Sequence, residues 1–272
     1  MKFLGRHHTK IRVPILMYHE ISKISERNKR VRSTNPIYSL TVNHFREQME
    51  FLAQNDYQTL SLNEIVSGEA KKQPKPIAIT FDDGFYNNYT NAFPILRDLG
   101  LKATIFTITG FIGTKKFMDW NQLSEMNNSS ISIQSHTESH RPLSGLSSNE
   151  IKQELDISKK SIEDHLGSSV DFLSAPHGMM DRNVRNLAKA LGYIGMCTSE
   201  PGFSHSFNIP VVFKRINISD QHDLQTFQKI VQMDLMPILS ATLSKRIKNM
   251  MKSIMGYNNY RRLYRLWYRV GD

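Results

Sequence analysis

The chain has 272 residues, of which 39% are hydrophobic and 22% are charged, and its formal net charge at pH 7 is +10. This composition supplies enough apolar side chains for a sizeable core and excludes a globally disordered chain. The single cysteine, Cys197, excludes an internal disulfide framework, and its place in an apolar run predicts a small core residue.

The N-terminal segment, residues 1–12, is basic and is predicted to be an extension ahead of the folded domain. The first apolar run, Val13–Tyr18, is too short for the hydrophobic region of a signal peptide. No segment reaches the roughly 18 consecutive apolar residues that a membrane-spanning helix needs. We therefore expect no signal peptide, no transmembrane segment and a cytoplasmic location.

Short apolar runs then alternate with amphipathic segments. Phe45, Met49 and Leu52 share a helix face, and Ser147 with Glu150 forms a capping box at a helix start. Repeated strand–helix order favours a parallel sheet, and about eight units favour a barrel over an open sheet. The predicted strands are residues 15–18, 57–60, 77–81, 103–108, 131–135, 172–175, 193–198 and 211–218. The glycines expected just past helix ends, in the left-handed conformation, are Gly100, Gly167 and Gly192.

Two clusters of polar side chains follow predicted strands. Asp82 and Asp83 come directly after one apolar run, and His136 and His140 come after another. One carboxylate oxygen and two imidazole nitrogens form a three-ligand set that leaves a divalent metal an open position for water. The second carboxylate is then available as a base. Because barrel enzymes build their sites at the C-terminal ends of strands, this pattern predicts a metal-assisted hydrolase.

Each cluster alone has a structural alternative. An Asp-Asp-Gly sequence also serves as a turn, in which glycine supplies a positive φ. Two histidines four residues apart also occur on solvated loops and helices. The conjunction of the two clusters, each after a strand, is what favours the metal site.

The chain resembles the polysaccharide deacetylase family, the NodB-homology domain of carbohydrate esterase family 4. The resemblance covers roughly residues 13–220, and residues 14–19 are similar to the branch that acts on poly-N-acetylglucosamine and related exopolysaccharides. It implies a distorted (β/α) barrel over residues 13–235 and metal-dependent removal of acetyl groups from N-acetylated sugars. The stretches that carry it are residues 77–84, 102–106 and 135–140.

By position, the resemblance implies that Asp82 is the catalytic base and that Asp83, His136 and His140 are the metal ligands. Zinc is the expected metal, and cobalt and nickel suit the same ligands. The stretch Ser174–Gly178 resembles the family's Pro-aromatic-Gly turn. This likeness implies that the backbone amide of His177 stabilises an oxyanion, with Pro176 and Gly178 beside the substrate.

The sequence departs from the family pattern in two places. Many relatives carry an arginine at the start of the turn that precedes Pro176, where this chain has Ser174. We expect Arg215, which resembles an arginine on a later strand of the exopolysaccharide branch, to orient Asp82 instead; the alternative is a surface arginine on an edge strand. The histidine that protonates the leaving amine in relatives also has no clear match. The substitutes are His19, His177, His205 and His222, of which His19 is best placed, although a structural role for it is equally compatible with the sequence.

Trp120 offers a flat apolar surface on which a sugar ring can stack, and its structural alternative is anchoring of a loop on the barrel.

The character of the chain changes at residue 236. From residue 245 onward eight Lys and Arg residues oppose a single Asp, and apolar residues recur at helical spacing beside a border of tyrosines. Residues 236–272 are thus predicted to form a basic, aromatic helical tail that lies at a membrane surface, at the inner face of the membrane. A helix packed on the barrel is the alternative, and nucleic-acid binding is disfavoured because the body has no recognised binding module.

The predicted function is a metal-dependent hydrolase that removes N-acetyl groups from an N-acetylated saccharide, free or lipid-linked, in exopolysaccharide or surface-glycan biosynthesis. Two alternatives stay open. The first is a catalytically weak saccharide-binding or scaffolding protein that retains the metal site. The second is a deacylase or deformylase that acts on another small acyl group.

Overall fold

A computed structural model describes residues 12–23, 36–204, 211–234, 236–237, 239–240 and 242–243. Nine parallel strands form one sheet in the order β10-β9-β8-β7-β6-β5-β1-β11, with β4 paired to the start of β5. The strands are β1 (Ile15–Tyr18), β4 (Gln58–Thr59), β5 (Pro76–Phe81), β6 (Ala103–Thr107), β7 (Ile131–Ser135), β8 (Phe172–Ser174), β9 (Gly195–Cys197), β10 (Val211–Phe213) and β11 (Ile216–Asn217). A separate parallel pair joins β2 (Glu20–Ser22) to β3 (Ser39–Thr41).

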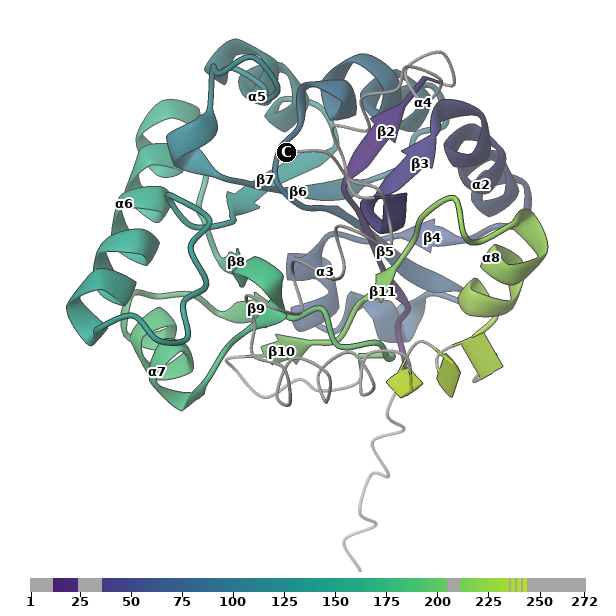
Figure 1. Ribbon diagram of the computed structural model, residues 1–272. Coiled ribbons are helices and arrows are strands. Elements are labelled where there is room, and N and C mark those ends of the chain that lie inside the picture. The colour runs from purple at the N-terminus through teal and green to yellow at the C-terminus, as the bar shows by residue number, and fades with distance from the viewer. Residues whose placement is uncertain are drawn as a thin grey trace, which may run out of the picture.

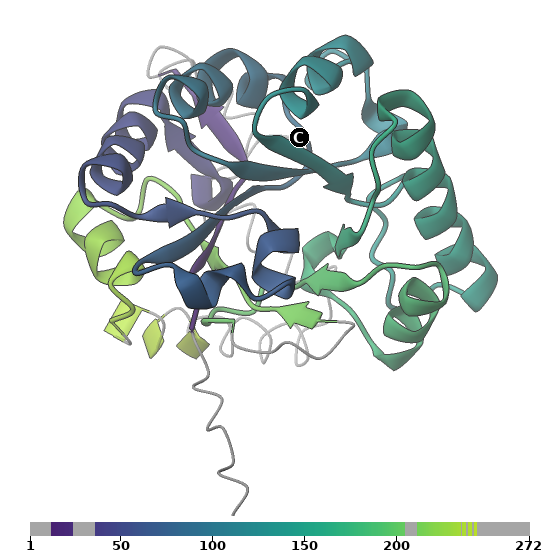
Figure 2. The ribbon, with the colours of Figure 1, turned by 180° about the vertical axis from the view of Figure 1, so that it is seen from behind.

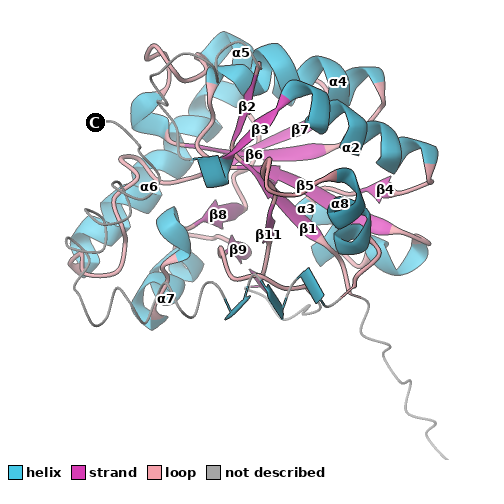
Figure 3. Cartoon of the chain, turned by 45° about the vertical axis from the view of Figure 1, so that its right-hand side comes forward, coloured by secondary structure: helices cyan, strands magenta, loops and turns pink. Residues whose placement is uncertain are grey.

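Helices surround this sheet on its outer side, as Figure 1 and the opposite view in Figure 2 show. The cartoon coloured by secondary structure shows the strands gathered inside this layer (Figure 3). The helices are α2 (Val42–Gln54), α3 (Leu62–Val66), α4 (Phe93–Asp98), α5 (Trp120–Asn127), α6 (Ser148–Leu166), α7 (Arg182–Ala190) and α8 (Leu224–Val231). The shorter helical turns are η1 (Pro36–Tyr38), η2 (Glu69–Lys72), η3 (Asn88–Ala92), η4 (Thr109–Phe111) and η5 (Pro176–Gly178).

This arrangement is the predicted distorted barrel. Seven predicted strands coincide with β1, β4, β5, β6, β7, β8 and β9 within two residues at either end. The predicted strand 211–218 is wrong as a continuous element, because it breaks into β10 and β11 at Lys214 and Arg215. The backbone N–H of Arg215 donates to the carbonyl of Glu200, and the arginine side chain is fully buried.

The break lies where the barrel closes. Strands β10 and β11 are the two edges of the sheet, paired to β9 and β1 respectively, and they follow one another in the chain. The two residues between them therefore carry the chain from one edge to the other. Closure by a bent connection instead of a strand pair accounts for the distortion of the barrel.

The core has two layers because successive strand residues point to opposite faces of the sheet. One set, which includes Leu16, Ile79 and Ile105, packs with residues of the surrounding helices. The alternate set forms a second cluster, whose members include Ile15, Ala78, Phe106, Phe172 and Cys197. Cys197 is thus the small core residue that the sequence predicts.

Local signals fix the ends of α6, the longest described helix. Ser147 and Glu150 form the predicted capping box, in which each side chain accepts a hydrogen bond from the other residue's backbone N–H. The helix ends at Gly167, whose φ of 63° is in the left-handed region. Gly100 and Gly192 also have positive φ, as predicted.

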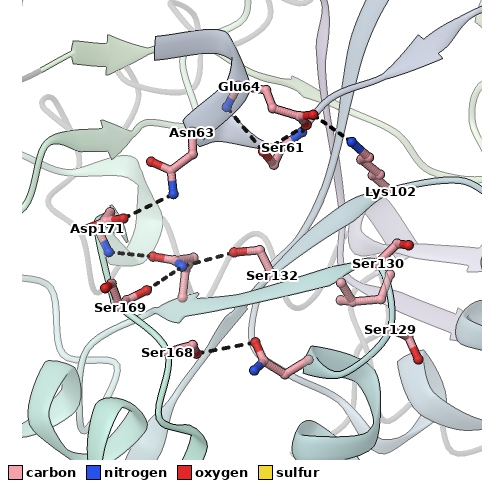
Figure 4. A pocket seen from close by; sticks show the side chains of 13 residues that line it. Ser61, Asn63, Glu64, Lys102, Ser129, Ser130, Ser132, Ser168, Ser169 and Asp171 are labelled. Atoms are coloured by element: carbon pink, nitrogen blue, oxygen red, sulfur yellow. Dashed lines mark hydrogen bonds and ion pairs between the residues drawn. The ribbon is translucent and has the colours of Figure 1, made fainter. Parts of the chain in front are cut away.

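A polar cavity of about 540 Å³ lies at the N-terminal ends of β6, β7 and β8 (Figure 4). Its side chains pair with one another: Asn63 donates to Asp171 at 3.1 Å, and Lys102 donates to Glu64 at 2.6 Å. None of the predicted catalytic residues lines it. The chemistry predicted from the sequence therefore belongs to the opposite end of the strands.

Several sequence predictions concern residues outside the described ranges: His205, residues 1–11 of the N-terminal extension and the basic segment 245–272. None of the helices in the described part of the chain is both long enough and apolar enough to cross a bilayer.

The packing of α6 on the barrel is testable with a matched pair of substitutions. Leu155 is fully buried, whereas Ile157, two residues along the same helix, is 45% exposed. Leu155→Ala should lower the free energy of unfolding by about 2–5 kcal/mol, because it leaves a cavity in the core. Ile157→Ala should change it by less than about 0.5 kcal/mol. Urea unfolding measures both, and equal losses would contradict the packing described.

Candidate active site

Three predicted ligands converge at the C-terminal ends of the strands. Asp83 follows β5, and His136 and His140 lie in the loop that follows β7. Asp83 Oδ1 is 3.4 Å from Nε2 of His136 and 3.4 Å from Nε2 of His140. The three ligand atoms lie within 4.8 Å of one another, which is close enough for them to share one ion.

An unusual backbone conformation brings these side chains together. Asp83, Thr137, His140 and His177 all have positive φ, between 57° and 74°. Residues other than glycine rarely adopt this left-handed region, which costs about 1–2 kcal/mol per residue. Such strain persists only where the surrounding structure fixes it, and it gathers at functional sites.

The two imidazoles differ in their surroundings. His136 is buried, and its Nδ1 lies 2.7 Å from the carbonyl oxygen of Ser174, so Nδ1 carries the proton and Nε2 is left to face Asp83. Burial opposes the charged form of His136, but Asp82 and Asp83 outweigh it and raise its pKa. Burial and repulsion from His136 lower the pKa of His140 to about 4, so its ring is neutral at pH 7 and available as a ligand.

These donors fit a divalent metal. Two imidazole nitrogens and one carboxylate oxygen are the ligand set of many catalytic zinc sites, and they leave a coordination position open. His136 also has the hydrogen bond to a backbone carbonyl that typically orients a metal-binding histidine. Asp83, His136 and His140 are therefore the residues that would hold the ion.

Beside this triad, Asp82 forms a buried ion pair with Arg215. Nη1 of Arg215 donates to Asp82 Oδ1 and Nη2 donates to Oδ2, each at 2.7 Å. Arg215 Nε donates to the carbonyl of Thr198 at 3.1 Å, and Nη1 also reaches the hydroxyl of Thr80 at 3.3 Å. This fork-like geometry fixes the plane of the carboxylate as well as its charge.

Ser174 forms hydrogen bonds with both members of this ion pair. Its hydroxyl accepts from Arg215 Nη2 at 2.9 Å and donates to Asp82 Oδ2 at 3.1 Å. Burial would raise the pKa of Asp82, but the charge and hydrogen bonds of Arg215, with His136 nearby, hold it well below its ordinary value. Asp82 is thus ionised at neutral pH.

Pro176, His177 and Gly178 form the helical turn η5 directly after β8, so the turn lies at the same end of the barrel. The rings of His177 and His140 are 5.1 Å apart between centroids. A Cβ on Gly178 would lie 2.5 Å from the backbone nitrogen of Ser199, so only glycine fits there. The structure brings this turn next to the triad.

His19 follows β1, and burial lowers the pKa of its ring, although the charges of Asp83 and Asp82 act in the opposite direction. Its Nδ1 is buried and has no hydrogen-bond partner among the described residues. Its ring lies against Tyr38, with 4.4 Å between centroids. Of the other predicted substitutes for the missing acid, His222 instead contacts Ser219 through Nδ1.

Trp120 is engaged in packing between helices. It begins α5, and its indole stacks on His165 near the end of α6, with 3.9 Å between centroids and 5° between planes. The indole also packs against the hydrophobic core. The predicted contact of Trp120 with a sugar could therefore use only the face of the indole that His165 does not cover.

Two residues of the site were missed by the sequence reasoning. From the sequence, Ser174 is only a position where the family's arginine is missing, although its hydroxyl bonds both members of the ion pair. Glu154 of α6 was not singled out, yet it bonds the backbone between His136 and His140. Its signal was available in the sequence, because Glu154 interrupts the apolar face that Ile151 and Leu155 define.

The chain is similar to known polysaccharide deacetylases. A family model described as polysaccharide deacetylase matches residues 69–196. The Bacillus subtilis (strain 168) protein YxkH, which carries the name of a polysaccharide deacetylase, is 34% identical over 211 residues, or 76% of this chain and 72% of YxkH. A poly-beta-1,6-N-acetyl-D-glucosamine N-deacetylase of Staphylococcus aureus (strain MRSA252) is 28% identical over 230 residues, or 75% of this chain and 78% of that protein.

Solved structures are similar over most of the chain. The Streptococcus pyogenes deacetylase PplD, solved in complex with acetate, has a TM-score of 0.74 and 25% identity, and the match covers 82% of this chain and 99% of that one. The Bacillus cereus polysaccharide deacetylase BC0361 has a TM-score of 0.72 and 28% identity, with 81% and 69% covered.

The buried ion pair yields a prediction about stability. Arg215→Met should lower the free energy of unfolding by about 3–5 kcal/mol, because it leaves the Asp82 carboxylate buried and unpaired. The double variant Arg215→Met/Asp82→Asn should lose less than the sum of the two single losses. Urea unfolding measures the cycle. Arg141→Met, which breaks an exposed pair with Glu150, is the control and should leave the free energy of unfolding nearly unchanged. Strict additivity would rule out the coupling.

Proposed function

Because this chain belongs to the polysaccharide deacetylase family, we propose that it removes N-acetyl groups from an N-acetylated sugar or polysaccharide with a bound divalent metal. The observation that carries the proposal is the placement of the ion pair Asp82–Arg215 directly beside the triad of Asp83, His136 and His140. A base and a three-ligand set in adjacent positions are the requirements for activating water against an amide.

An acetamide is a poor electrophile and neutral water is a poor nucleophile. Asp83, His136 and His140 would hold the divalent ion, and zinc, cobalt or nickel suits these ligands. When bound, such an ion would lower the pKa of water and polarise a carbonyl. The remaining steps belong to the chain's own side chains.

Asp82 is the proposed base that accepts the proton of the attacking water. Its low pKa keeps it ionised, and the bidentate contact with Arg215 holds both carboxylate oxygens in a fixed plane. Oδ2 accepts from both Arg215 and Ser174, whereas Oδ1 accepts from Arg215 alone and so keeps a lone pair for a further hydrogen bond. Arg215 is thus a positioning residue for Asp82.

The developing negative charge needs a hydrogen-bond donor, and the departing amine needs a proton. We assign the first role to the backbone N–H of His177, in the turn that packs beside His140. We assign the second to His19, because its buried Nδ1 lacks a partner within the described residues and it lies near both aspartates. Pro176 and Gly178 shape the substrate side of the turn.

The substrate proposal follows the relatives. Proteins named poly-beta-1,6-N-acetyl-D-glucosamine N-deacetylase share 28% identity over 75% of this chain. We therefore propose an N-acetylhexosamine unit within an exopolysaccharide or surface glycan, free or attached to a lipid carrier.

The test is acetate release from N-acetylglucosamine oligomers. Asp82→Asn should lower kcat by about 10²–10⁴-fold, because the base is lost. It should retain the bound metal, whereas His140→Ala should lose it; metal analysis of the purified proteins separates these two cases. Asp98→Asn, an exposed aspartate at the end of α4, is the control and should match the parent. Full activity of Asp82→Asn, or of the parent after exhaustive chelation, would refute the mechanism.

We also propose that residues 13–235 form the catalytic domain and that the tail, residues 236–272, holds the enzyme at the inner face of a membrane. Support comes from the charge excess after residue 245 and from exposed apolar side chains just before it, Met236, Leu239 and Leu243. Each basic residue near an anionic leaflet contributes about 1 kcal/mol.

Liposome flotation tests the tail. The full chain should float with vesicles that contain anionic lipid, less so at high salt, whereas a variant ending at residue 244 should stay with the soluble fraction. Equal recovery of the two proteins would argue that the tail packs on the barrel instead.

A further inference from the structure

Helix α6 carries a buried carboxylate that points at the metal-ligand loop. Glu154 is only 5% exposed and lies on the helix face that otherwise buries Ile151, Leu155 and Ile162. Placing an acidic side chain in such a face is costly unless its oxygens are fully hydrogen-bonded. Its hydrogen bonds therefore identify what the residue does.

Within the described residues, the hydrogen bonds of the Glu154 side chain all go to the segment between the two histidine ligands. Oε2 accepts the backbone N–H groups of Glu138 at 3.1 Å and Ser139 at 2.9 Å, and Oε1 accepts the hydroxyl of Ser139. Three donors thus converge on one carboxylate. These are the donors of a tight loop that would otherwise be unsatisfied.

The loop needs this support because its backbone is strained. Thr137 has φ of 67° and His140 has φ of 59°, so left-handed residues lie on both sides of the segment that Glu154 holds. On its other side the segment packs against Gly110, whose N–H donates to the Glu138 carbonyl at 2.9 Å. A Cβ at residue 110 would lie 2.7 Å from that carbonyl oxygen, so the loop is held closely on both faces.

The two histidines depend on this loop to different degrees. His136 is fixed independently, since its backbone N–H donates to the carbonyl of Thr107 and its ring contacts Ser174. The backbone N–H of His140 donates to the hydroxyl of Thr137, within the loop itself. The position of His140 relative to Asp83 therefore depends on the conformation of residues 137–139.

We propose that Glu154 is a positioning residue for the metal site: by holding the Glu138–Ser139 backbone, it keeps His140 in reach of the ion that Asp83 and His136 bind. This inference rests on the proposed metal-dependent function. Residues that orient ligands from behind typically change metal affinity by 10–100-fold when they are removed.

The experiment measures zinc affinity, not catalysis, by competition with a chromophoric chelator on metal-free protein. Glu154→Leu leaves two backbone N–H groups without an acceptor and should raise the zinc Kd by about 10–100-fold. Glu154→Gln keeps one oxygen for these N–H groups, and its amide nitrogen can donate to the Ser139 hydroxyl. It should therefore recover most of the affinity. The control is Asp164→Leu, an exposed acidic residue on the same helix, which should leave the Kd unchanged.

A second readout reports geometry. In cobalt-loaded protein, the visible absorption bands should change in Glu154→Leu and return to the parent spectrum in Glu154→Gln. Ser139→Ala removes a single hydrogen bond and provides the same test if Glu154→Leu fails to fold, with a rise in Kd of about fivefold. The role of Glu154 would be overturned if Glu154→Leu and Ser139→Ala both kept the zinc affinity and the cobalt spectrum of the parent. If Glu154→Leu does not fold, the same result for Ser139→Ala alone would overturn it. Either outcome would leave the proposed function intact. A parent protein that binds no metal would overturn both.

Discussion

The contact between Arg215 and Asp82 is the interaction on which the site depends. It joins the connection between the two edge strands to the residue that directly follows β5. A buried charge is tolerated only when it is paired and fully hydrogen-bonded. The guanidinium meets this condition with contacts to Thr80, Ser174 and Thr198 besides Asp82. Closure of the barrel and orientation of the carboxylate are consequently the same structural feature.

Asp82 and Asp83 show how a single peptide unit separates two chemical roles. The carboxylate of Asp82 turns inward to Arg215, whereas Asp83, with φ of 74°, directs its carboxylate toward His136 and His140. In a regular strand, two successive side chains point to opposite faces of the sheet, so only one of two adjacent aspartates could reach the site. The left-handed conformation of Asp83, two residues beyond the end of β5, is therefore what allows adjacent aspartates to serve as a base and as a ligand.

The fold was largely predictable because its signals are local. Apolar runs separated by capped amphipathic helices specify a barrel whatever its function, and Ser147 with Glu150 begins α6 at the predicted residue. The error at residues 211–218 has a physical cause. A long-range contact draws Arg215 into the interior and breaks a segment whose composition favours one strand.

The sequence by itself determined the chemical composition of the site, because Asp82–Asp83 and His136 directly follow apolar runs, His140 lies four residues beyond His136, and parallel strands end at a common edge. It did not determine the partners that orient these groups. The roles of Ser174 and Glu154 arise from hydrogen bonds to neighbours 92 and 15–16 residues away in the chain. Hydrogen bonds between distant segments depend on how the strands and helices pack, so the tertiary structure alone decided which carboxylate faces the arginine and which supports the ligand loop.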